Sequence, residues 1–217
     1  ARMTGRPGVC AVTSGPGATN VITGIATAFA DSIPLICITG QVNSELLGSD
    51  VFQEADITGS CEPFVKHSYL VKNAADIPRI MKEAFHIAGT GRQGPVLIDV
   101  PTDIQMEKIR FSYPETVDIR SYKPNFVGHP GQIKRVVTAL ANAKRPLICA
   151  GGGVFSSDAC DELLTFSQKA NIPVVTTMMG LSCIPADYSL NLGMIGMHGT
   201  KASNFGVTDC DLLIVIG

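Results

Sequence analysis

The chain has 217 residues, of which 45% are hydrophobic and 17% are charged, and its formal net charge is −2. This composition is rich enough in apolar residues to bury a core, and it differs from that of disordered chains. The basic residues are scattered along the sequence, so we expect no nucleic-acid partner. No apolar run approaches the roughly 20 residues that cross a bilayer, so no membrane partner is expected either.

The first hundred residues alternate short β-rich runs with helical runs. The expected strands cover residues 9–12, 34–39, 69–71 and 96–100, and the expected helices cover residues 21–29 and 77–88. Alternation of this kind predicts an α/β fold in which a parallel sheet is flanked by helices.

A proline-containing stretch without apolar periodicity then interrupts the pattern, and we interpret residues 110–130 as a linker. After it come an amphipathic segment over 133–140, strands over 146–150 and 172–176, a helix over 158–170 and a terminal apolar strand. The predicted organisation is therefore one domain over 1–109, the linker, and part of a second α/β domain over 131–217. Because both ends look cut, we expect the chain to be an internal fragment.

A turn of small residues, Ser14–Asn20, lies between the first strand and the first helix. Gly15 and Gly17 have the spacing of a dinucleotide-binding turn, but Asn20 stands at the third glycine position. No acidic residue follows at the end of a second strand, so the dinucleotide interpretation is poor. The turn is either an ordinary tight connection or a place where the backbone approaches a ligand.

A second block, Phe52–Asp56, joins an aromatic residue, an amide and two carboxylates. One interpretation is a solvated helix start, with Ser49 or Asp50 as its cap and Glu54 in the first turn. That interpretation explains the acids. It does not explain the aromatic residue and the amide that stand beside them at the edge of a loop.

A third block, Gly94–Pro101, is an apolar run closed by proline and is typical of a buried parallel strand. Arg92 stands just before it. An arginine at such a turn is by default a surface residue, but its charge also suits a phosphate or the polar edge of a flavin.

Two glycine-containing segments mark the second domain. Gly151, Gly152 and Gly153 follow a strand and precede the expected helix, for which Ser157 or Asp158 could serve as the cap. Such a segment either connects the two elements or offers N–H groups to a ligand. A loop over residues 192–199 adds methionines, glycines and a histidine. The other histidines lack metal-ligand spacing, and no metal site is predicted.

The three blocks Ser14–Asn20, Phe52–Asp56 and Gly94–Pro101, in this order and spacing, resemble the acetolactate synthase family of thiamine diphosphate (ThDP) enzymes, large catalytic subunit. The resemblance runs along all 217 residues. It implies that the first domain is the ThDP pyrimidine-binding domain and that the second is the start of the central FAD-binding domain.

The resemblance also implies site residues. Gln53 and Phe52 would act in catalysis, Gln53 near ThDP and Phe52 near the substrate, while Pro16 and Asn20 would contact the aminopyrimidine. Many members carry lysine at the mouth of the substrate channel, where this chain has Thr102. The implied FAD contacts are Arg92, Gly151, Gly152, Gly153, Thr176, Thr177, Met178, Met197, His198 and Gly199.

Members of the family condense pyruvate with pyruvate or 2-oxobutanoate, with loss of CO2, in valine, leucine and isoleucine biosynthesis. The implied cofactors are ThDP, Mg2+ and FAD. The implied partners are further catalytic subunits, as a homodimer or homotetramer, and a small regulatory subunit. The activating glutamate would lie before Ala1 and the metal motif beyond Gly217, so we expect the chain alone to be inactive.

Two alternatives remain open at this point. Glyoxylate carboligase and sulfoacetaldehyde acetyltransferase share similar glycine turns, and a non-catalytic α/β binding module would share the fold. Seven cysteines, odd in number and far apart, behave as small core residues rather than as disulfides or zinc ligands. They predict a reducing compartment, which agrees with a cytoplasmic enzyme.

Overall fold

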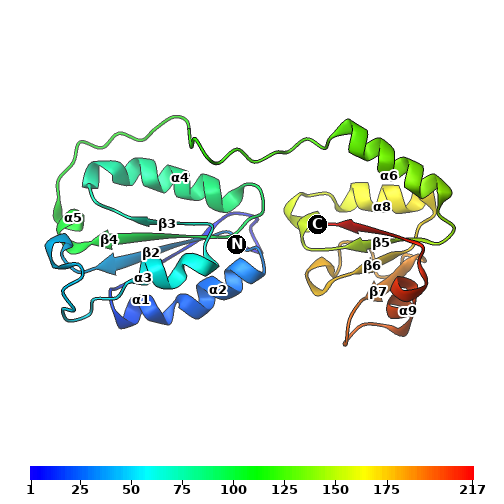
Figure 1. Cartoon of the computed structure of the whole chain (residues 1–217), viewed down its shortest axis with the longest axis horizontal. Helices are drawn as coiled ribbons and strands as arrows, with labels where there is room; N and C mark the ends of the chain where they lie inside the picture. The colour runs from blue at the N-terminus through cyan, green and yellow to red at the C-terminus, as the bar shows by residue number, and fades with distance from the viewer. The chain divides into compact units, whose positions relative to one another are not determined.

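The computed structural model describes residues 1–217 and divides into two compact units, Ala1–Phe126 and Val127–Gly217 (Figure 1). Each unit contains one four-stranded sheet in which every strand pairing is parallel. Helices flank both sheets, which confirms the predicted α/β class. No helix combines the length and the apolar character that crossing a membrane requires.

The first sheet has the strand order β1-β2-β4-β3. Its strands are β1 (Gly8–Val12), β2 (Leu35–Gln41), β3 (His67–Leu70) and β4 (Pro95–Pro101). The helices of this unit are α1 (Pro16–Asn20), α2 (Ile22–Ala30), α3 (Ile57–Cys61), α4 (Ile77–Gly89) and α5 (Thr102–Met106), with short 3-10 turns at Ser44–Leu46, Glu62–Phe64 and Ala74–Asp76.

Strand β4 is the centre of the first unit, and all seven of its residues are buried. On one face, α4 packs Ile80, Ala84 and Ile87 against the sheet. On the other face, α1, α2 and α3 bury residues such as Ile25 and Ile57 against it. Burial on both faces explains why β4 is a continuous apolar run rather than an alternating one.

The second sheet has the strand order β7-β6-β5-β8. Its strands are β5 (Pro146–Ala150), β6 (Val174–Thr176), β7 (Asn191–Met194) and β8 (Leu212–Ile216). Its helices are α6 (Pro130–Asn142), α7 (Gly153–Ser156), α8 (Cys160–Ala170) and α9 (Lys201–Asp209), with a 3-10 turn at Met178–Gly180. Residues of α8 pack on one face of this sheet and residues after β7 pack on the other.

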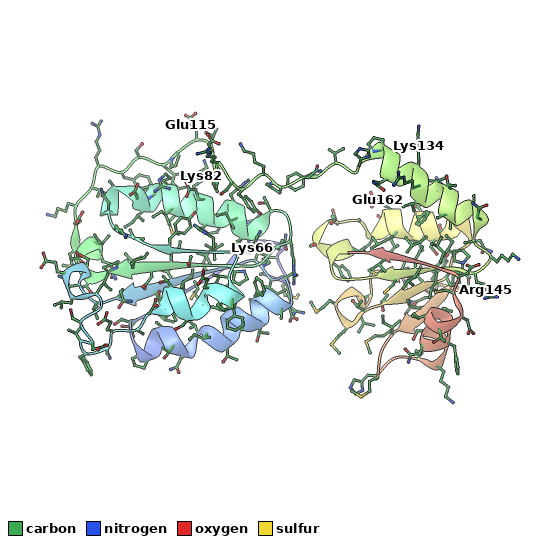
Figure 2. All side chains as sticks on the ribbon, in the orientation of Figure 1. Lys66, Lys82, Glu115, Lys134, Arg145 and Glu162 are labelled. Carbon is green, nitrogen blue, oxygen red and sulfur yellow. The ribbon has the colours of Figure 1, made fainter.

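The segment after α5 has no regular structure and runs along α4 as part of the first unit (Figure 2). The Lys82 ammonium donates to the backbone oxygens of Pro114 and Glu115, at 2.6 Å for the latter. The Lys66 ammonium donates to the Tyr122 hydroxyl at 2.9 Å. The division between the units falls after Phe126, within the stretch interpreted as the linker.

The structure corrects three local predictions. The Ser14–Asn20 block is mostly helix α1, which Pro16 opens at a position where its missing N–H costs nothing. The helix predicted over 158–170 begins at Cys160 without a side-chain cap, because Asp158 has φ +53° and separates α7 from α8. The predicted loop over 192–199 begins as strand β7, whose periodicity is hidden by a register shift in its pairing with β6.

All seven cysteines are free thiols. Cys37, Cys61, Cys149 and Cys183 are buried, and the other three are half-buried. Burial raises the pKa of the Cys37 thiol, and neighbouring Cys10 adds to the effect. These residues therefore serve as small core side chains, as the sequence predicts.

Candidate functional site

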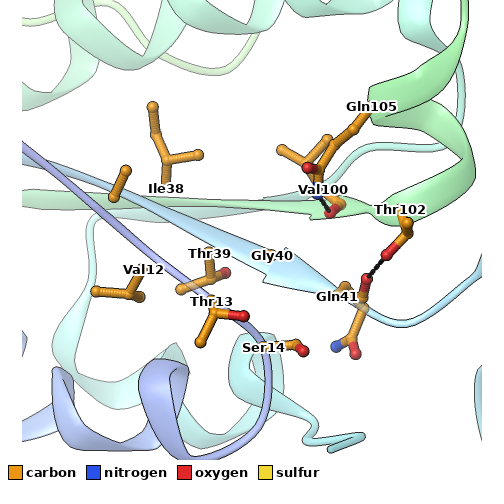
Figure 3. A pocket seen from close by; sticks show the side chains of 11 residues that line it. Val12, Thr13, Ser14, Ile38, Thr39, Gly40, Gln41, Val100, Thr102 and Gln105 are labelled. Atoms are coloured by element: carbon orange, nitrogen blue, oxygen red, sulfur yellow. Dashed lines mark hydrogen bonds between the residues drawn. The ribbon is translucent and has the colours of Figure 1, made fainter.

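The carboxyl ends of parallel strands share one edge of a sheet, and in open α/β folds ligands bind at that edge. In the first unit this edge carries a cavity of about 350 Å³ (Figure 3). Its walls come from the ends of β1, β2 and β4 and from α5. The polar residues that line it include Thr13, Ser14, Thr39, Gln41 and Thr102.

Two of the sequence blocks meet at this edge. Gly15, the residue before α1, has φ +58° and ψ −120°, a backbone conformation that is essentially restricted to glycine. A Cβ atom on Gly15 would lie 2.9 Å from the Cα, the Cβ and the backbone oxygen of Gln53. The glycine therefore lets the first turn pack directly on the backbone of the second, although 38 residues separate them in the sequence.

Gln53 lies at the tip of a turn and has a left-handed φ of +62°. Glu54 stabilises this turn from within, because its carboxylate accepts hydrogen bonds from the backbone N–H groups of Gly48 and, at 3.2 Å, Val51. Helix α3 begins only at Ile57, and its cap is Asp56, which accepts from the Gly59 N–H at 2.9 Å. The block is thus a structured turn and not the helix start capped at position 49 or 50.

Gln53 packs against Gly15, and Phe52 and Pro16 are the chain neighbours of these two residues. Asn20 ends helix α1, and Arg92 lies away from this edge. Pro16, Asn20 and Gln53 are exposed, and Phe52 is 89% exposed although it is aromatic. Arg92 precedes β4 and therefore lies at the opposite edge of the sheet. Its guanidinium donates to the Ser32 hydroxyl at 2.9 Å and stands 5.7 Å from the centre of the Phe29 ring.

A buried polar network lies beneath the Gln53 turn. The Thr39 hydroxyl donates to one carboxylate oxygen of Asp99 at 2.7 Å, and the Gln41 amide donates to the other at 3.0 Å. Asp99 is 1% exposed, and this burial raises the pKa of its carboxyl group from 3.8 to about 6. The two hydrogen bonds oppose the shift, while nearby Asp56 adds to it.

Sequence reasoning missed this network. A signal was present, because an aspartate inside an apolar buried strand needs partners to offset its desolvation. Thr102, at the position where many members carry lysine, donates from its hydroxyl to the Gln41 backbone oxygen at 2.8 Å. It lines the cavity without adding a positive charge.

The second sheet gathers the remaining predicted residues at its own carboxyl edge. Gly151–Gly153 follow β5, Thr176–Met178 lie at the end of β6, and Met197–Gly199 follow β7. The Ile195 N–H donates to the Thr176 oxygen at 2.9 Å, which joins the last two groups. Thr176 also has a buried hydroxyl without a hydrogen-bond partner, beside a cavity of about 240 Å³.

Contacts within the chain explain the glycine triplet. A Cβ on Gly151 would lie 2.4 Å from the Gly217 oxygen, and one on Gly153 would lie 2.5 Å from the Gly217 Cα. A Cβ on Gly152 would lie 3.0 Å from the Cβ of Met179. Close packing within the chain thus accounts for the three glycines, on backbone atoms for Gly151 and Gly153 and on the Met179 Cβ for Gly152.

The turn that carries Met197 and His198 is held by Asn204. Its side-chain amide accepts from the Gly196 N–H at 2.9 Å and donates to the Gly196 oxygen at 3.0 Å. His198 is exposed, and Met197 is 92% exposed. An exposed methionine on a well-hydrogen-bonded turn is available to contact a ligand or another chain. The structure contains no group of three or more His, Cys, Asp or Glu side chains that could hold a metal.

Two family models of thiamine pyrophosphate enzymes match this chain. Residues 1–60 match the family model for the thiamine pyrophosphate enzyme N-terminal TPP binding domain, and residues 133–217 match the model for the central domain. The probable acetolactate synthase large subunit of Methanocaldococcus jannaschii is 53% identical over 220 residues, covering 100% of this chain and 37% of the relative.

Similar relatives occur in bacteria. The acetolactate synthase large subunit of Buchnera aphidicola subsp. Schizaphis graminum is 52% identical, and the acetolactate synthase isozyme 3 large subunit of Escherichia coli is 48% identical. Each match covers 100% of this chain and 38% of the relative. The chain therefore spans a little over a third of the length of these curated relatives.

Proposed function

Because this chain belongs to the thiamine pyrophosphate enzymes, we propose that it forms the N-terminal and central-domain part of an acetolactate synthase large subunit. The complete enzyme condenses two 2-oxo acids, pyruvate with pyruvate or with 2-oxobutanoate, and releases CO2. Its products lead to valine, leucine and isoleucine.

One structural observation carries the proposal. The Gly15 turn, which resembles the ThDP-binding turn of the family, packs on the backbone of Gln53. Gln53 belongs to the second of the three blocks that resemble acetolactate synthases. The proposed cofactor-binding turn at Gly15 and the turn at Gln53 are therefore in direct contact.

The residues of the first two blocks fit the aminopyrimidine of ThDP. Asn20 and Gln53 offer side-chain amides, Pro16 and Phe52 offer apolar side chains, and all four are exposed. This combination suits a flat aromatic ring with hydrogen-bonding nitrogens at its edge. When bound, ThDP would supply the electron sink that decarboxylation of a 2-oxo acid requires. Gln53 would orient the bound group, and Phe52 would shield the substrate from water.

FAD and Mg2+ are further parts of the proposal. At the second edge, Met178, Met197 and His198 are exposed and could contact a flavin ring. Thr176 adds an unpartnered hydroxyl beside a cavity. Residues outside this chain would bind Mg2+. The enzyme would be a cytoplasmic homodimer or homotetramer, with a small regulatory subunit as a further partner.

The direct test is to supply the full-length enzyme with pyruvate, ThDP, Mg2+ and FAD and to measure acetolactate and CO2. The proposal predicts both products, with 2-oxobutanoate accepted as the second substrate. Turnover of glyoxylate or sulfoacetaldehyde without acetolactate formation would assign the chain to another ThDP enzyme.

Replacing Gln53 with alanine in the full-length enzyme is expected to lower turnover by about 1–3 kcal/mol of transition-state stabilisation. The melting temperature should change little, because Gln53 lies on an exposed turn. Steady-state kinetics and thermal unfolding measure the two effects. A melting temperature that falls in step with activity would make Gln53 a structural residue.

Replacing Arg92 with alanine is expected to weaken FAD binding about tenfold, which corresponds to the loss of one charge-assisted hydrogen bond. A flavin titration followed by visible absorbance measures the affinity, and excess FAD should restore activity. Arg79→Ala is the matched control, because Arg79 is an exposed arginine already paired with Asp76 and Glu83. Equal FAD affinity in both variants would leave Arg92 as a surface residue bound to Ser32.

A further inference from the structure

One side chain ties the Gln53 turn to the sheet. The Gln41 amide, at the end of β2, donates to the Ala55 backbone oxygen at 2.7 Å. The other hydrogen bonds of residues 51–56 stay within residues 48–60. Gln41 thus provides the hydrogen bond that fixes the height of the turn above the strands.

Gln41 is itself held from both ends of its amide. Its nitrogen donates to Asp99 at 3.0 Å as well as to Ala55, and its oxygen accepts from the Val42 N–H at 2.9 Å. Gln41 is 5% exposed, and Asp99 is anchored in turn by Thr39. Because both amide hydrogens and the amide oxygen of this buried side chain are hydrogen-bonded, the side chain has one stable orientation.

We propose that Gln41, oriented by Asp99, is a positioning residue that holds Gln53 against the Gly15 turn in the cofactor-binding geometry. This inference rests on the function proposed above. Gln53 keeps a left-handed backbone conformation, which costs free energy and persists only where the surroundings enforce it. Removing the hydrogen bond from Gln41 to Ala55 would let the turn relax and move the Gln53 amide away from bound ThDP.

The first test is hydrogen exchange of the amides in residues 48–57 of this chain. In Gln41→Met, which keeps the side-chain volume but removes both donors, we expect these amides to exchange about tenfold faster. Gln105→Met is the matched control, since Gln105 also lies at this edge but donates at 2.7 Å to the Val100 oxygen. Unchanged exchange in Gln41→Met, or equal acceleration in the control, would overturn the proposal.

A second variant guards against loss of the fold. Gln41→Met leaves one oxygen of the buried Asp99 carboxylate without its donor, which destabilises the fold. Combining it with Asp99→Asn removes the unpaired charge. The double variant should fold and still show the faster exchange. Protection at the wild-type level in a folded double variant would also overturn the proposal.

The second test is a double-mutant cycle on ThDP affinity in the full-length enzyme. Gln41→Met and Gln53→Ala should each weaken ThDP binding, by about tenfold, and the combination should be no weaker than Gln53→Ala alone. Multiplying effects would mean that Gln41 acts through another route, which contradicts positioning. If Gln53→Ala alone has no effect, the proposed site fails, and the exchange experiment still decides whether Gln41 orders the turn.

Discussion

Replacing Gly15 with alanine is expected to lower the free energy of unfolding by about 2–5 kcal/mol, combining a disallowed backbone conformation with overpacking. The new Cβ would lie 2.9 Å from three atoms of Gln53, including its backbone oxygen and Cα. These atoms belong to a turn and cannot retreat as the end of a flexible side chain can. In the full-length enzyme, ThDP binding should weaken in parallel.

Chemical denaturation of the chain measures the first effect, and Gly24→Ala provides the control. Gly24 lies inside α2, and a Cβ there would meet no atom within 4 Å. That substitution should stabilise the fold by roughly 0.5–1 kcal/mol, because alanine favours the helix. A Gly15→Ala variant as stable as Gly24→Ala would show that the two turns are not in contact.

The stability of the first unit is expected to fall as the pH rises from about 4 to 7, through the titration of Asp99. The pKa of this carboxyl group is raised from 3.8 to about 6 in the folded state. The group therefore contributes stability that is fully present below 3.8 and is lost as the pH passes 6. The loss amounts to roughly 3 kcal/mol at most, given 1.36 kcal/mol per pKa unit.

Asp99→Asn removes this titration. The unfolding free energy of the wild type minus that of the variant should therefore decrease as the pH rises along the same range. Asp103→Asn is a control of opposite sign, because hydrogen bonds from Ser44 lower the pKa of the half-buried Asp103 carboxyl. The stabilisation by Asp103 should be lost only as the pH falls. A pH-independent difference for Asp99→Asn would mean that Asp99 titrates normally in the folded state.

Much of the fold could be predicted from local sequence patterns. The apolar run of β4 and the amphipathic period of α4 are properties of neighbouring residues, and their alternation is enough to indicate parallel strands with helices between them. The residue types in Ser14–Asn20 and Phe52–Asp56 likewise indicated the family, because the motif is local. The same reasoning failed at β7, where a glycine with φ +91° and a register shift remove the alternation.

The way in which these elements combine depends on contacts between residues far apart in the sequence. The approach of Gly15 to Gln53 depends on the pairing of β1 with β2, and the bond from Gln41 to Asp99 depends on the register that places Thr39 opposite Asp99. Gln41 and Asp99 are 58 residues apart, so no local pattern links them. Local sequence defines which chemical groups are present and which elements carry them. Only the packing of the strands determined which groups meet, because contacts between distant residues follow from strand order and register.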